Sequence, residues 1–210
     1  PDIGPGGGLQ CDCGFIRSVE RIARVMRRLI IAFAGIALVA TACSDGALSV
    51  DEYAATVESQ AGEHADEVTA LADRNISELS IAVARLQDET EGDELAAAAI
   101  AETARLASHL FAGIGDALDR YAQQLDELDA PSELEEDHGA YIVALEASRT
   151  GIAPLVSDLS TAATFDDIDR AIASSGFSDA QPRVVAACTS LQRSIATLGP
   201  VVDLRCEPSG

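Results

Sequence analysis

Two pairs of residues have the side-chain types and the spacing that bind a metal ion. His64 precedes Glu67 by three residues, and Glu135 precedes His138 by the same interval. Side chains three residues apart share one face of a helix, and an imidazole with a carboxylate suits iron, zinc or copper. A complete site in a helical protein needs further ligands from other helices. We therefore predict no bound cofactor, and we keep His64, Glu67 and His138 as candidate metal ligands, with polar residues that bind nothing as the alternative.

The sequence around the first pair is similar to the motif of a known family. Residues 62–67 read Gly-Glu-His-Ala-Asp-Glu. This segment resembles the G-x-H-x-x-E motif of the imelysin-like periplasmic proteins, which are helical and linked to iron. The resemblance implies an iron-type, metal-binding helical lipoprotein as an alternative function. The aromatic residue that usually stands beside the histidine of that motif is absent here.

Motifs of the common catalytic classes are missing. The sequence has no Gly-x-Ser-x-Gly segment, and its three histidines fall on three different predicted helices. The run Asp166, Asp167, Asp169 lacks the glycine and the closing glutamate of an EF-hand loop. Negative charge at the start of a helix accounts for that run. We predict that the protein is not an enzyme.

Glycines interrupt two of the predicted helices. Gly113 and Gly115 lie in one helix, and Gly151 lies in the next, on the other side of a turn at Pro131. Glycine inside a helix costs about 1 kcal/mol relative to alanine, so these positions need another reason. Counted from the turn, the two breaks lie at a similar height of a helical hairpin. We predict a small pocket at Gly113, Gly115 and Gly151, with close helix packing as the alternative.

The segment from Met26 to Cys43 has the parts of an export signal in their usual order. Two arginines follow Met26, residues 29–39 form an unbroken apolar run, and Ala-Thr-Ala precedes Cys43. The run is too short to span a bilayer but fits a signal peptide. The segment resembles the lipobox signal of bacterial lipoproteins, with Ala40 where leucine is commonest. An uncleaved anchor or an ordinary secretory signal is the alternative.

The lipoprotein resemblance implies a division of the chain and a location. In that family the thiol of Cys43 receives diacylglycerol, and cleavage before it leaves a lipid-anchored protein that faces outside the cytoplasm at the cell membrane. Residues 1–25 are then a mis-assigned or disordered leader, residues 26–42 the signal peptide, residues 43–48 a tether and residues 49–210 the domain.

The charge of the domain restricts its partners. The chain has 14 basic residues, all arginine, and 35 acidic ones. Residues 1–42 hold five of the arginines and three of the acidic residues, so nine basic and 32 acidic residues remain, a net charge of −23. Such a surface repels nucleic acid and anionic lipid. Besides the membrane at its anchor, the domain is expected to contact an unidentified protein or a small cationic ligand. The sequence leaves the oligomeric state open.

Hydrophobic periodicity predicts an all-α fold. Apolar residues recur at helical spacing in four long segments, which begin near Ser49, Asp93, Ser132 and Ser178. A short helix is expected from Thr164 to Gly176. Ser49 with Glu52 predicts a capping box, and Thr164 with Asp167 predicts a cap. Short connections favour an antiparallel up-down helical bundle of about four long helices plus one short helix, with a coiled-coil dimer as the alternative.

Two cysteines remain for a disulfide bond in the exported domain. Cys188 lies in the last predicted helix, and Cys206 lies in the tail beyond Gly199 and Pro200. The tail is long enough to run back along the helix, and an oxidising compartment favours the bond. We predict a Cys188–Cys206 disulfide that clips the tail, with two free thiols as the alternative. The cysteine-containing C-terminal pattern from Ala187 onward is similar to lipoproteins of actinobacteria that have no assigned activity.

Overall fold

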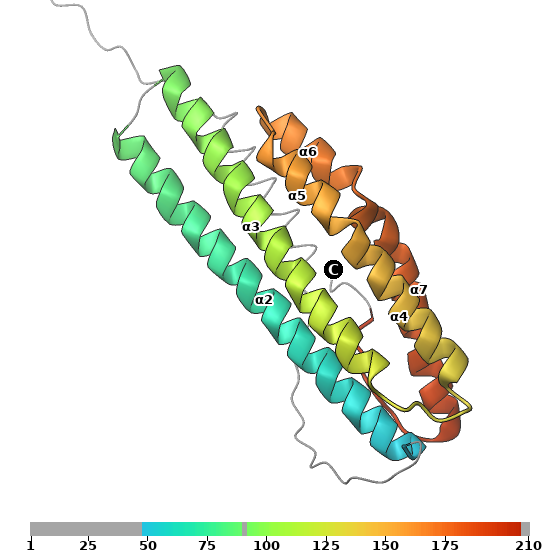
Figure 1. Ribbon diagram of the computed structural model, residues 1–210. Helices are drawn as coiled ribbons and strands as arrows, with labels where there is room; N and C mark the ends of the chain where they lie inside the picture. Colours follow the sequence, from blue (N-terminus) through green and yellow to red (C-terminus); the bar gives the residue numbers. More distant parts are fainter. Residues whose placement is uncertain (1–47, 90–91, 207–210) are drawn as a thin grey trace, which may run out of the picture.

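The computed structural model describes residues 48–89 and 92–206. Within these ranges the protein contains six helices and no strand, so the predicted all-α class is confirmed (Figure 1). The predicted signal segment and Cys43 lie outside the described residues. None of the helices in the described part is long and apolar enough to cross a membrane. The helices are α2 (Val50–Glu89), α3 (Gly92–Asp126), α4 (Glu135–Thr150), α5 (Ile152–Ser160), α6 (Phe165–Ala173) and α7 (Gly176–Leu198).

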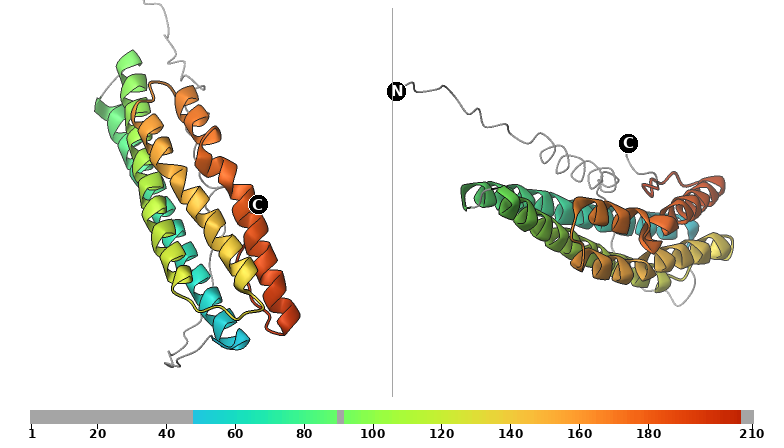
Figure 2. Two further views of the ribbon diagram at one scale, coloured as in Figure 1. Left: turned by 45° about the vertical axis from the view of Figure 1, so that its right-hand side comes forward. Right: turned by 90° about the horizontal axis from the view of Figure 1, so that it is seen from above.

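The long helices pack side by side in two pairs. Helix α2 lies along α3, and α4 lies along α7, while α5 continues the line of α4 and packs on α3 (Figure 1). Helix α6 packs against α5, as both further views show (Figure 2). The start of α2, the end of α3, the start of α4 and the end of α7 gather at one end of the molecule. We call it the Leu48 end, because the Leu48 amide donates a hydrogen bond there to the Asp129 carbonyl, at 3.2 Å.

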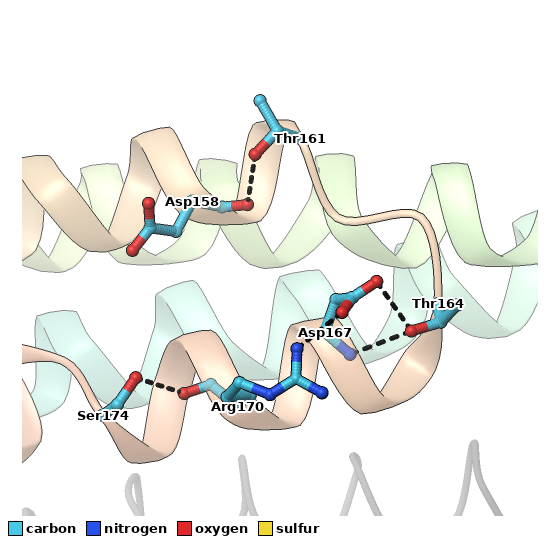
Figure 3. Close-up of polar contacts among 6 residues, drawn as sticks. All are labelled: Asp158, Thr161, Thr164, Asp167, Arg170 and Ser174. Atoms are coloured by element: carbon cyan, nitrogen blue, oxygen red, sulfur yellow. Dashed lines mark hydrogen bonds and ion pairs between the residues drawn. The ribbon is translucent and has the colours of Figure 1, made fainter.

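Side-chain caps begin α2 and α6 where the sequence predicts them. At the start of α2, the Glu52 amide donates to Ser49 Oγ at 3.3 Å, and the Ser49 amide donates to the Glu52 carboxylate at 3.2 Å. At the start of α6, the Asp167 amide donates to Thr164 Oγ1 at 3.1 Å (Figure 3). Asp167 also accepts hydrogen bonds from the Thr164 hydroxyl and the Arg170 guanidinium, both at 2.7 Å. Each cap satisfies amides that the first turn of a helix leaves unpaired.

The core combines large apolar side chains with many alanines. Tyr53, Val57 and Leu79 of α2 are buried, as the hydrophobic stripe predicts. The same helix also buries five alanines. Because the distance between packed helices depends on the side chains at their contact, these alanines allow α2 to lie close to its neighbour. The buried alanines of α2 are Ala54, Ala61, Ala65, Ala72 and Ala82.

Two helix boundaries differ from the predictions. The third long helix was expected to begin at Ser132 and to be interrupted at Gly151; α4 begins instead at Glu135, and the interruption divides the segment into two helices, with α5 beginning after Gly151. The Ser132 hydroxyl bonds the neighbouring Glu133 carboxylate at 3.0 Å instead of capping the helix. Gly176 was expected to close the short helix, but it is the first residue of α7, whose N-cap is Ser175. The break after Gly151 and the start of α7 at Gly176 coincide with a close backbone approach between these two glycines, described below.

The C-terminal tail folds back on α7, as predicted. Gly199 ends the helix at a φ of +126°, a conformation that side chains rarely adopt. Beyond it, Val202 and Leu204 are buried against the core. Cys188 and Cys206 form a disulfide bond, with their Cα atoms 5.4 Å apart. The tail is therefore held to α7 by both a covalent bond and apolar packing.

Candidate functional site

A small polar hollow lies between α2 and α3. It has room for about 60 Å³ and opens to solvent on one side. About one turn of α2 and two turns of α3 contribute to it. The lining residues are Glu63, His64, Glu67, Ala117, Arg120, Tyr121 and Gln124. The hollow therefore includes both members of the first predicted metal-binding pair.

His64 forms the inner wall of the hollow. Its side chain is buried and stacks on the Tyr121 ring, with centroids 4.7 Å apart and planes 9° apart. Burial lowers the pKa of His64 to about 4; a hydrogen bond to the backbone of Ala117 opposes this shift, and the nearby Arg120 charge adds to it. Burial dominates because it disfavours the charged imidazolium. His64 is therefore a neutral ring at physiological pH.

Glu67 lies at the mouth of the hollow and forms an ion pair with Arg120 across the two helices. Both side chains are about half exposed, at 43% and 54%. The carboxylate therefore faces a fixed cation, which competes with a metal ion for it. Within the described residues, no group of three or more histidine, cysteine, aspartate or glutamate side chains is placed to hold a metal.

His138, the third candidate ligand, lies in the core and pairs with a tyrosine. The Tyr53 hydroxyl is 2.7 Å from His138 Nδ1. Burial lowers the pKa of His138, and a hydrogen bond to the Leu125 backbone opposes this shift. Burial also raises the pKa of Tyr53. Glu135, the predicted partner of His138, is exposed, so this second pair does not face one site.

The contacts among the buried tyrosines are the feature that sequence reasoning missed. The hydroxyls of Tyr121 and Tyr141 are 3.4 Å apart, and their rings meet edge to face. Burial raises the pKa of both phenols, that of Tyr141 to about 12. With the Tyr53–His138 pair, all three tyrosines of the chain and two of its histidines lie in the core. The sequence contains a sign of this contact: Tyr121 and Tyr141 are each ten residues from Pro131 in the turn, so the two residues lie at the same height of the helical hairpin.

At Gly113, Gly115 and Gly151, where a pocket was predicted, the structure leaves little room for a side chain. A Cβ added at Gly113 would lie 3.2 Å from the Leu71 side chain, and one at Gly115 would lie 3.2 Å from Ile152. A Cβ added at Gly151 would lie 2.1 Å from the Phe177 amide nitrogen. Close packing, the stated alternative, is what the structure has at these positions. The hollow lies instead beside Ala117 and Tyr121, farther along α3.

The hollow is small, with a volume of about 60 Å³. Its lining combines two carboxylates, one guanidinium and the stacked rings of His64 and Tyr121. The chain matches no profile of a known protein family, no characterised protein and no solved structure.

Proposed function

We propose that the protein is a membrane-anchored lipoprotein that faces outside the cytoplasm and acts as a non-enzymatic binding domain. Its helices form an antiparallel up-down bundle that is tethered through Cys43. The bundle presents the polar hollow between α2 and α3 to a small cationic group, either free or at the end of a larger partner.

Two features support the export part of the proposal. Disulfides persist in oxidising compartments, and the Cys188–Cys206 bond clips the tail of this domain. Leu48, at the end of the predicted tether, is fixed to Asp129 by a backbone hydrogen bond. The five residues from Cys43 to Ala47 span at most about 17 Å when extended. A lipid on Cys43 would therefore hold the Leu48 end close to its membrane.

The observation that carries the binding part is the set of side chains around the hollow. Glu63 is exposed at its edge, Glu67 is paired with a single arginine, and His64 is neutral at physiological pH. Two carboxylates thus face one guanidinium, and the site keeps one uncompensated negative charge. The volume of about 60 Å³ admits an ammonium or methylammonium group but not a whole metabolite. The acidic surface of the domain draws cations toward it.

A titration of the full chain with methylammonium chloride tests the binding part. The imidazole C–H resonances of His64 are expected to shift with saturation, whereas those of the exposed His109 stay in place. Sodium chloride at matched ionic strength is the control for screening. Glu63→Gln is expected to weaken binding by up to about fivefold, the range of an exposed ion pair. Asp73→Asn, which changes an exposed carboxylate elsewhere on α2, is the matched variant.

The binding part is wrong if His64 responds equally to the two salts, or if Glu63→Gln and Asp73→Asn behave alike. Mass spectrometry of protein extracted from membranes tests the anchor separately. A diacylglyceryl group on an N-terminal Cys43 is expected, and Cys43→Ser is expected to abolish both the modification and the partition into detergent. Unchanged partition of that variant would contradict the anchor.

A further inference from the structure

Two large apolar side chains are exposed together at the Leu48 end. Leu198 is the last residue of α7 and is 43% exposed, and Val201 follows it across the Gly199 turn and is 93% exposed. We call the segment Leu198 to Val201 the apolar tip. The other exposed large apolar residues of the described part are Ile81 and Val143, which lie singly on α2 and α4.

The fold explains why Val201 points outward but not why it is apolar. Side chains alternate along the extended tail, so that Val202 and Leu204 are buried while Val201 and Asp203 are exposed. At the equivalent outward position, Asp203 is charged, and the Asp203 amide donates to the Glu58 carboxylate at 2.9 Å. A polar residue at position 201 would fit the same backbone. Val201 lies three residues after the exposed Leu198, and a contact from outside the domain at this point would cover apolar surface.

The position of the apolar tip in the molecule indicates what it contacts. The C-terminal end of α7 and the start of α2 lie at the same end of the molecule (Figure 1). In the anchored protein, the tether holds that end within about 17 Å of the lipid on Cys43. We propose that the apolar tip inserts Val201 and Leu198 into the outer edge of the bilayer, which fixes the orientation of the bundle. This inference rests on the lipid anchor of the proposed function.

The acidic residues near the tip determine which lipid headgroups it can approach. The nearby first turn of α2 carries Asp51 and Glu52, and the first turn of α4 carries three more acidic residues. Anionic headgroups are repelled by such a surface, whereas zwitterionic headgroups are not. The tip therefore suits a zwitterionic interface, and it needs the covalent tether because two apolar side chains alone bind a membrane weakly.

Fluorescence of a single tryptophan tests the tip, since the chain has no native tryptophan. Val201→Trp places the reporter at the tip, and Ile81→Trp places it at a site that is 68% exposed, toward the far end of α2. Each protein is purified from membranes and reconstituted into phosphatidylcholine vesicles whose acyl chains carry bromine. The Val201→Trp emission is expected to be quenched at least twofold more than that of Ile81→Trp. Equal quenching of the two would overturn the inference.

A second preparation separates this inference from the proposed function. With Cys11→Ser and Cys13→Ser, Cys43 is the one cysteine outside the disulfide, and a maleimide lipid in the vesicle couples to it. Selective quenching in this preparation, with no lipid on Cys43 in cells, would support the tip and refute the anchor. A diacylglyceryl group on Cys43 without selective quenching would support the anchor and refute the tip.

Discussion

Replacement of His64 by phenylalanine is expected to make the protein less sensitive to mild acid. The imidazole is buried against Tyr121, and burial lowers its pKa to about 4. In the unfolded chain a histidine has a pKa of about 6.5. The unfolded state therefore binds a proton between these two values while the folded state does not. Stability from the neutral ring is present above pH 6.5 and is lost as the pH falls toward 4.

The size of this effect follows from the two pKa values. Each pH unit between them removes about 1.4 kcal/mol of folding free energy, so the full interval corresponds to about 3 kcal/mol. Between pH 7 and pH 5 the wild-type protein should lose about 2 kcal/mol through His64 alone. Phenylalanine keeps a flat ring against Tyr121 but has no proton to bind. The same pH change should therefore cost His64→Phe about 2 kcal/mol less than it costs the wild type.

Urea unfolding followed by far-ultraviolet circular dichroism at the two pH values measures this difference. His138 is retained in both proteins, so its contribution cancels, and so do those of carboxylates with lowered pKa values such as Asp137. His109→Phe, which removes an exposed histidine, is the matched control. If His64→Phe and the wild type lose the same free energy, the ring is not held neutral by burial.

Three further changes test the packing and the clip. Gly151→Ala should destabilise the protein by about 3 kcal/mol or more, because the added methyl group meets backbone atoms. Gly139→Ala, at an open position within α4, should leave the stability unchanged or raise it by up to about 1 kcal/mol. Urea unfolding midpoints of the two variants measure the difference. The double variant Cys188→Ser with Cys206→Ser should be about 3 kcal/mol less stable than the oxidised wild type. A reducing agent should lower the urea midpoint of the wild type but not that of the double variant. Tyr53→Phe should cost about 1–2 kcal/mol by calorimetry, because it leaves a buried histidine without its 2.7 Å partner; an unchanged melting temperature would contradict that pairing.

The sequence predicts the parts of the fold that depend on local chemistry. Capping depends on side chains three residues apart, so Ser49 with Glu52 and Thr164 with Asp167 could be identified directly. The disulfide could be predicted because only two cysteines remained to form it and the tail was long enough to run back along α7. The cause of the break after Gly151 could not be predicted from local sequence. The glycine indicates a weak point in the helix, but the contact with α7, more than 20 residues later, does not follow from local sequence.

The candidate site could be predicted only in part, for a similar reason. Spacing placed His64 and Glu67 on one helix face, but it could not show that Arg120 of the next helix lies across from Glu67. That opposite charge competes with a metal ion for the carboxylate. The buried tyrosines follow from helical periodicity, yet hydroxyl contacts such as the 3.4 Å approach of Tyr121 and Tyr141 depend on the relative rotation of two helices. Periodicity does not determine that rotation.

The crossing of Gly151 and Gly176 also constrains how this chain can change during evolution. The Cβ of any other residue at position 176 would stand 3.2 Å from the Gly151 Cα, and one at position 151 would overlap backbone atoms of residues 176 and 177. A side chain at either position therefore requires a compensating shift in the other segment. Among descendants of this sequence, the two glycines should be inherited together, and a lineage that loses one should also have altered the length or path of the connection near the other.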